Sequence, residues 1–221
     1  ADKIGVKIVE DACHAPLAKY SDEKGIINKV GSCNHSIAST LSFHAIKHIT
    51  AGEGGVVLTN NKLLADFAKK FRSHGIIKNQ DLTIDNKNRL NTWYYEMSDL
   101  GYNYRLSDLN CALGFSQLKK LKSNLIRRNK IANLYHKYLS NITNIKLPAL
   151  ISEKKGYHAW HLFSLNVNFR KILIKKNDMI HQLAQKGVGT QVHYIPLNYH
   201  PYFKRINVTL KDNSNAKKYY D

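Results

Sequence analysis

Three groups of residues near the start of the chain have the types and order needed for amine chemistry. Asp11 follows a short β-branched run, Lys47 ends the hexapeptide at residues 42–47, and a glycine-rich stretch occupies residues 52–55. A lysine held against an apolar strand and glycines can lose hydration, which lowers the pKa of its amine and makes it a nucleophile for Schiff-base formation. Asp11 could keep a pyridinium nitrogen protonated, and the Ser42 hydroxyl could bind a phosphate oxygen.

Each of these residues also has an ordinary structural explanation. Asp11 could cap the turn after its strand, and Lys47 could be a solvated loop lysine. The glycines could serve only to permit a sharp bend. The functional interpretation therefore depends on the joint pattern and not on any single residue.

The hydrophobic pattern predicts the elements that would position these groups. Residues 4–9 are predicted to form a buried parallel strand, residues 36–43 and 56–59 two further strands, and residues 63–73 a helix that packs back on the sheet. The carboxyl ends of parallel strands are where α/β sheets carry their sites. The order of elements predicts an α/β fold.

The rest of the chain divides into a loop, a long helix and a smaller unit. Residues 74–104 are predicted to be a long functional loop or an interface segment, and residues 107–139 a helix with a Ser-Asp cap. A strand at 161–169 and a helix at 174–186 follow. We therefore expect an α/β domain over residues 1–124 and a smaller, incomplete α+β domain over residues 125–221.

Composition excludes several classes of protein. The chain has 221 residues, 43% of them hydrophobic, and no apolar run long enough for a membrane helix. Three cysteines without a Cys-x-x-Cys pair favour a reducing cytoplasm over a disulfide framework. A net charge of +18 would attract nucleic acid, anionic lipid or a phosphorylated small molecule. No nucleic-acid recognition pattern accompanies the scattered basic residues, so a solvated basic surface is the favoured interpretation.

The eleven histidines raise the question of a metal site. His44 and His48 stand four positions apart, but Ala45 takes the place of the glutamate that a zinc-protease helix requires. His158 and His161 are predicted to lie in or beside a strand, where a spacing of three puts side chains on opposite faces. No metal site is expected.

Several motifs in the same order resemble one enzyme family. They are Val9-Glu10-Asp11-Ala12-Cys13-His14-Ala15, the hexapeptide Ser42-Phe43-His44-Ala45-Ile46-Lys47, Gly52-Glu53-Gly54-Gly55, Gly101-Tyr102-Asn103-Tyr104-Arg105, and Gln191-Val192-His193-Tyr194-Ile195-Pro196. Together they resemble the DegT/DnrJ/EryC1/StrS family of PLP-dependent sugar aminotransferases. The sequences around His44 and His193 resemble those of a branch that makes a pseudaminic acid precursor.

The resemblance implies a fold type I aminotransferase in which Lys47 binds PLP as a Schiff base and shuttles a proton. It implies that Asp11 holds the pyridine nitrogen, that His14 lies beside the ring and that Ser42 binds the phosphate. Asn103 would reach the phosphate of the neighbouring subunit in a homodimer.

The resemblance also implies the substrates. Glutamate would be the amino donor and a 4-keto nucleotide sugar the acceptor, bound in part by His193 and Tyr194, in cell-surface glycan synthesis. Dehydratases of the family carry His where Lys47 stands, so transamination is favoured.

The family's amino-terminal and closing segments have no counterpart in the sequence, so we expect a fragment of a longer protein. Two alternatives stay open: a catalytically silent fragment that acts as a binding module, and a basic nucleic-acid-binding protein.

Overall fold

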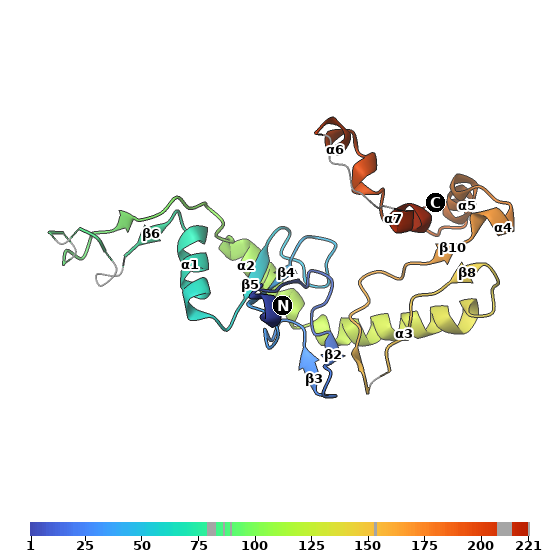
Figure 1. The fold of residues 1–221 in the computed structure, drawn as a ribbon, viewed down its shortest axis with the longest axis horizontal. Helices are drawn as coiled ribbons and strands as arrows, with labels where there is room; N and C mark the ends of the chain where they lie inside the picture. Colours follow the sequence, from blue (N-terminus) through green and yellow to red (C-terminus); the bar gives the residue numbers. More distant parts are fainter. Residues whose placement is uncertain (79–82, 86, 89, 153, 207–213, 221) are drawn as a thin grey trace. The chain divides into compact units, whose positions relative to one another are not determined.

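The chain forms two compact units of mixed α/β structure. The computed structural model describes residues 1–78, 83–85, 87–88, 90–152, 154–206 and 214–220 (Figure 1). Unit 1 comprises Ala1–Ala132 with Leu150–His161, and unit 2 comprises Asn133–Ala149 with Leu162–Asp221. Residues 125–132 and 150–161 thus make their contacts in unit 1, and the division at residue 124 stays a prediction about the complete fold.

A three-stranded sheet in unit 1 carries the candidate site. The strands β1 (Val9–Asp11), β4 (Ala38–Ser42) and β5 (Gly55–Leu58) lie in the order β1-β4-β5. β1 runs parallel to β4, with Asp11 opposite Thr40, whereas β5 is antiparallel to β4. The two strands predicted at 36–43 and 56–59 are confirmed.

The first predicted strand begins too early. Residues 4–9 were expected to be buried and extended, but a 3-10 helix, η1 (Asp2–Ile4), precedes Gly5, whose φ of +67° turns the backbone out of the strand conformation. Sheet pairing begins only where the Ile37 amide donates to the Ile8 carbonyl at 2.9 Å. A run of β-branched residues forms a strand only where a neighbouring strand is available to pair with it.

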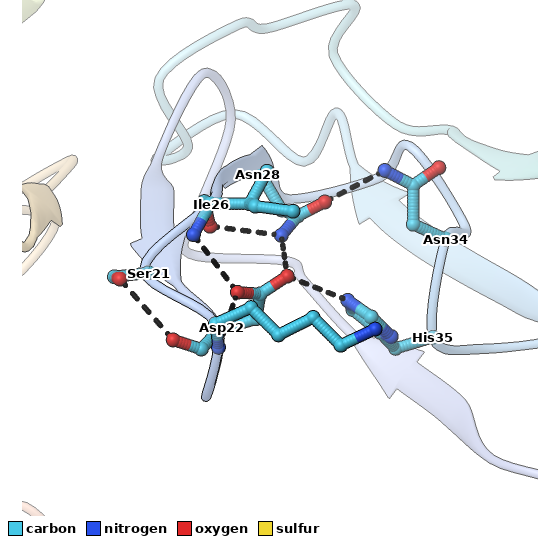
Figure 2. Close-up of polar contacts among 7 residues, drawn as sticks. Ser21, Asp22, Ile26, Asn28, Asn34 and His35 are labelled. Atoms are coloured by element: carbon cyan, nitrogen blue, oxygen red, sulfur yellow. Dashed lines mark hydrogen bonds and ion pairs between the residues drawn. The ribbon is translucent and has the colours of Figure 1, made fainter.

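A second small sheet of three strands also belongs to unit 1. The strands β2 (Lys19–Ser21), β3 (Ile27–Lys29) and β9 (Gly156–Tyr157) pair antiparallel in the order β3-β2-β9. Asp22 closes the β2–β3 hairpin, since its carboxylate accepts the Ile26 amide at 2.9 Å and the Asn28 side-chain amide at 3.1 Å (Figure 2). These bonds lower the pKa of Asp22, and the hairpin depends on this ionised carboxylate.

Helices α2 (Asp108–Leu118) and α3 (Leu121–Leu139) replace the single helix predicted over residues 107–139. The predicted cap is present, since the Ser107 hydroxyl accepts the Asn110 amide at 3.3 Å. The chain is interrupted at Lys119 and Lys120, so the continuous helix was a wrong prediction. The spacing of apolar residues continues across this short break, so the hydrophobic pattern alone does not reveal that the helix ends there.

Helix α1 (Lys62–Arg72) forms where predicted, but its apolar face is not buried as expected. Leu63 is 82% exposed and Phe67 51% exposed. The helix contacts β6 (Ile76–Ile77), which pairs with β7 (Glu96–Met97) inside the segment predicted to be a loop, part of which lies outside the described residues. Amphipathic spacing shows which face of a helix can be buried, while burial itself needs a partner surface.

Unit 2 contains one two-stranded sheet and several short helices. Strands β8 (Ile145–Lys146) and β10 (Asn166–Val167) pair antiparallel. The strand predicted at 161–169 is limited to Asn166–Val167, and it ends there because Asn168 caps α4 (Phe169–Ile172). The predicted helix at 174–186 is present as α5 (Lys176–Gln185). The remaining helices are η3 (Leu197–Tyr199), α6 (Pro201–Arg205) and α7 (Ser214–Tyr220).

The core of unit 1 forms where α3 packs against residues from three other segments of the chain. Leu121 and Leu125 of α3 pack with Ala18, Ile49 and Ala159. Among the described residues, no helix is long and apolar enough to cross a membrane.

Leu125→Ala is expected to destabilise unit 1 by about 2–5 kcal/mol, because it removes a side chain that is only 1% exposed and leaves a cavity. Urea unfolding of the protein expressed from its complete reading frame measures the change. Leu173→Ala is the matched control, since Leu173 is 90% exposed, and its unfolding free energy should stay within about 0.5 kcal/mol of the parent protein. Equal losses in the two variants would contradict the assigned core.

Candidate active site

Two loops leave the same edge of the sheet and carry the residues predicted to do the chemistry. β1 ends at Asp11 and β4 at Ser42, and the two strands are parallel neighbours. The Ala12 amide donates to the Thr40 carbonyl at 2.9 Å, which continues the pairing into the first loop. Residues 11–14 and 42–47 therefore begin side by side, as the strand order requires.

The Lys47 amine contacts His14 across the two loops. Lys47 Nζ lies 2.6 Å from His14 Nε2, and the lysine is half-buried while the histidine is exposed. A tight turn aims the lysine, because the Lys47 amide donates to the His44 carbonyl at 2.9 Å and the Ser42 hydroxyl accepts the His44 amide at 3.3 Å. In its ammonium form a lysine can only donate, so the contact then requires the His14 tautomer with its proton on Nδ1.

Asp11 is held as a carboxylate beside this pair. Its Oδ1 accepts the Cys13 backbone amide at 3.1 Å. Hydrogen bonds from the Cys13 side chain and amide lower the pKa of Asp11 most, and the positive charges of His14 and Lys47 lower it further. An exposed, ionised carboxylate that senses both charges fits a protonated ring nitrogen of PLP, and Lys47 offers the amine that its aldehyde needs.

Glycines let the backbone after Lys47 return close to β4. A Cβ on Gly55 would lie 2.7 Å from the Leu41 carbonyl oxygen, a backbone atom that cannot move aside. Gly54 has a φ of +141° and its carbonyl accepts the Phe43 amide at 2.8 Å. The glycine-rich stretch is therefore needed to hold the strand end that precedes Lys47.

Two histidines that the sequence suggested only as metal ligands lie next to the site. The His161 ring centroid is 4.1 Å from that of His14 and 5.1 Å from that of His48. Within the part of the chain that the structure describes, no group of three or more His, Cys, Asp or Glu residues is arranged to hold a metal ion. In the sequence, His48 directly follows Lys47, and this position is the one signal that could have placed a histidine near the site.

The other predicted site residues lie elsewhere in the chain. Asn103 is exposed and forms an isolated antiparallel bridge with Ser73 in unit 1. His193 and Tyr194 belong to unit 2, where their rings lie 4.3 Å apart, with the tyrosine exposed and the histidine half-buried. The roles predicted for these three residues stay predictions.

Comparison with known proteins identifies the class to which this site belongs. The sequence profile of the DegT/DnrJ/EryC1/StrS aminotransferase family matches residues 1–221. The structure is that of a fold type I PLP-dependent aminotransferase in part, with about half of the complete fold present. The chain belongs to the DegT/DnrJ/EryC1/StrS family, as its motifs indicated.

Individual relatives support this assignment. A UDP-4-amino-4,6-dideoxy-N-acetyl-β-L-altrosamine transaminase from Campylobacter jejuni is 36% identical over 99% of this chain and 52% of its own length. PseC of Helicobacter pylori, an aminotransferase of pseudaminic acid biosynthesis, superposes with a TM-score of 0.81 at 29% identity over 99% of this chain and 53% of its own. A putative sugar aminotransferase of Streptococcus pneumoniae in its PMP form gives a TM-score of 0.76 at 25% identity. The match covers 97% of this chain and 51% of the S. pneumoniae chain.

The chain spans about half the length of the curated relatives it matches.

Gly55→Ala is expected to displace the end of β4 because the added Cβ meets a backbone carbonyl. We expect a loss of about 1–3 kcal/mol of unfolding free energy, as for other overpacking substitutions, measured by urea denaturation. Gly189→Ala is the control, since a Cβ there meets no atom within 4 Å. Equal stabilities of Gly55→Ala and the parent protein would show that β4 and β5 do not approach so closely.

The protein is expected to lose stability as the pH falls from about 6.5 to about 4. Burial lowers the pKa of His161 from 6.5 to about 4, with further lowering by the charges of His14, His48 and Lys47. Between these two values the unfolded chain binds a proton that the folded chain does not, so acid favours unfolding. His161→Phe removes this titration and should flatten the pH dependence of urea midpoints; an unchanged slope would contradict the assignment.

Proposed function

We propose that this chain carries the cofactor lysine of a PLP-dependent aminotransferase that moves an amino group from an amino acid to a 4-keto nucleotide sugar. The observation that carries the proposal is the contact of Lys47 Nζ with His14 Nε2, 2.6 Å apart, beside the ionised Asp11. Family membership supports the reaction class. The named substrate of the C. jejuni relative supports the sugar class.

PLP, when bound, supplies an aldehyde that bonds to amines and a ring that accepts electrons from the adjacent carbon. Asp11 would hold the ring nitrogen, since its lowered pKa keeps the carboxylate ionised at neutral pH. The Ser42 hydroxyl, at the end of β4, would bind the phosphate. His14 would lie beside the ring, and Asn103, exposed in unit 1, would reach the phosphate of a neighbouring subunit in a homodimer.

Lys47 would hold and move the proton of the reaction at its Nζ atom. His14 Nε2 is close enough to accept that proton or to return it. The turn through Ser42 and His44 fixes the backbone of the lysine, so the amine needs little reorganisation to exchange a proton.

The finer parts of the proposal concern substrates and cellular setting. Glutamate is proposed as the donor and a UDP-linked sugar as the acceptor, bound in part by His193 and Tyr194, in cell-surface glycan synthesis. The net charge of +18 suits an anionic nucleotide sugar. The thiols of Cys13, Cys33 and Cys111 are free, which agrees with a reducing cytoplasm as the proposed location.

Lys47→Ala is expected to abolish covalent cofactor binding, because it removes the amine that contacts His14 Nε2. The protein from the complete reading frame, incubated with PLP, should show a visible absorbance band, and borohydride reduction followed by peptide mass mapping should place the cofactor on Lys47. The band should be absent from the variant.

Lys62→Ala is the control, since its amine pairs with Asp66 on the exposed face of α1. It should retain the band and the modified Lys47 peptide. Attachment of PLP to another lysine, or equal labelling of Lys47→Ala, would overturn the proposed function.

A further inference from the structure

A second imidazole supports the ring that touches the proposed cofactor lysine. His161 packs on His14 with ring centroids 4.1 Å apart and ring planes inclined by 42°. On another side it contacts His48, with centroids 5.1 Å apart. All three histidines and Lys47 belong to unit 1. His14 is exposed, so this contact covers part of a ring that solvent also reaches.

The backbone that carries His161 is tied to the core helix. The Arg128 guanidinium of α3 donates to the Trp160 carbonyl at 3.0 Å and to the His161 carbonyl at 3.4 Å. Asn129 of the same helix donates to the His158 carbonyl at 3.2 Å. Because Leu125 of α3 lies in the core of unit 1, these bonds tie the backbone that carries His161 to that core.

His48 is held in the same way from the lysine side. It is only 7% exposed, and its Nε2 lies 2.9 Å from the Ala159 carbonyl oxygen. A carbonyl can only accept, so His48 carries a proton on Nε2. The Nδ1 atoms of His48 and His161 are buried and have no hydrogen-bond partner among the described residues. The observed contacts of the His161 side chain are those of its ring with His14 and His48.

The charges around His161 favour its neutral form. His14, His48, Lys47 and Arg128 face it, and together with burial they lower its pKa to about 4. A neutral ring can pack against His14 without repelling it or the lysine amine. At neutral pH the contact is thus compatible with a protonated Lys47.

We propose that His161 is a positioning residue, whose ring packs on His14 and holds His14 Nε2 against Lys47 Nζ. The significance of the contact rests on the proposed function, in which Lys47 is the reactive amine. His161 does not touch the reacting atoms and acts through His14 alone. Its removal should loosen the His14 ring, weaken the contact of His14 Nε2 with Lys47 Nζ and change the reactivity of that amine.

The test measures the rate at which acetic anhydride acetylates Lys47 at pH 8 in the cofactor-free protein from the complete reading frame, quantified by peptide mass spectrometry. His14→Ala should raise the rate about three- to tenfold, because the Lys47 amine loses the ring that contacts Nζ and becomes more accessible to the reagent. His161→Ala and His161→Gln, which lack the ring, should raise it equally. His161→Phe, which retains a flat ring, should stay within about twofold of the parent.

A double variant distinguishes positioning from a general loosening of the fold. His14→Ala with His161→Ala should label at the rate of His14→Ala alone, since the two act through one contact. His136→Ala is the matched control, because His136 is also a half-buried histidine packed on an aromatic ring, Phe163, but lies in unit 2. It should leave Lys47 labelling unchanged.

Three results would overturn the proposal: parental labelling in His161→Gln, a rise in His161→Phe equal to that in His161→Gln, or a further rise on adding His161→Ala to His14→Ala. If His161→Ala fails to fold, the comparison of the Gln and Phe variants decides. Failure of PLP to attach to Lys47 would remove the proposed function, yet the labelling rates would still report whether His161 positions His14.

Discussion

The parallel pairing of β1 with β4 is the constraint on which the site depends. Because Val9, Glu10 and Asp11 lie opposite Ala38, Ser39 and Thr40 in the same direction, both strands end at one edge of the sheet. Asp11 and Ser42 therefore begin two loops that must run together, although 31 positions of sequence separate them. An antiparallel pairing would have carried the two loops to opposite edges.

Electrostatics and packing then determine what these loops can do. Hydrogen bonds from Cys13 lower the pKa of Asp11 most, and the charges of His14 and Lys47 lower it further, so the carboxylate is kept ionised. The glycines at 54 and 55 bring β5 back against β4 without a side chain in the way. The site is thus formed by short-range contacts within unit 1, and it is backed by α3 through the segment that carries His161.

The exposed apolar side chains of the helices fit a chain that spans about half the length of its relatives. Leu63 and Phe67 of α1, and Leu109 and Phe115 of α2, face solvent among the described residues. Leu63 and Phe67 are four positions apart, the spacing of one helix face, which accounts for the wrong prediction that α1 packs on the sheet. The amphipathic pattern shows which face of a helix is suited to burial. It does not show which surface covers that face.

Local patterns alone determined much of this protein: the strands around residues 38–42 and 55–58, the helix over 62–72, the Ser107 cap, and the family through its ordered motifs. Only the tertiary structure decided that Lys47 meets His14, that His161 stands behind it, and that residues 4–8 stay outside the sheet. The physical reason is that capping and periodicity act between residues a few positions apart. Ring packing, strand pairing and pKa shifts instead depend on groups brought together from distant positions, which no local pattern encodes.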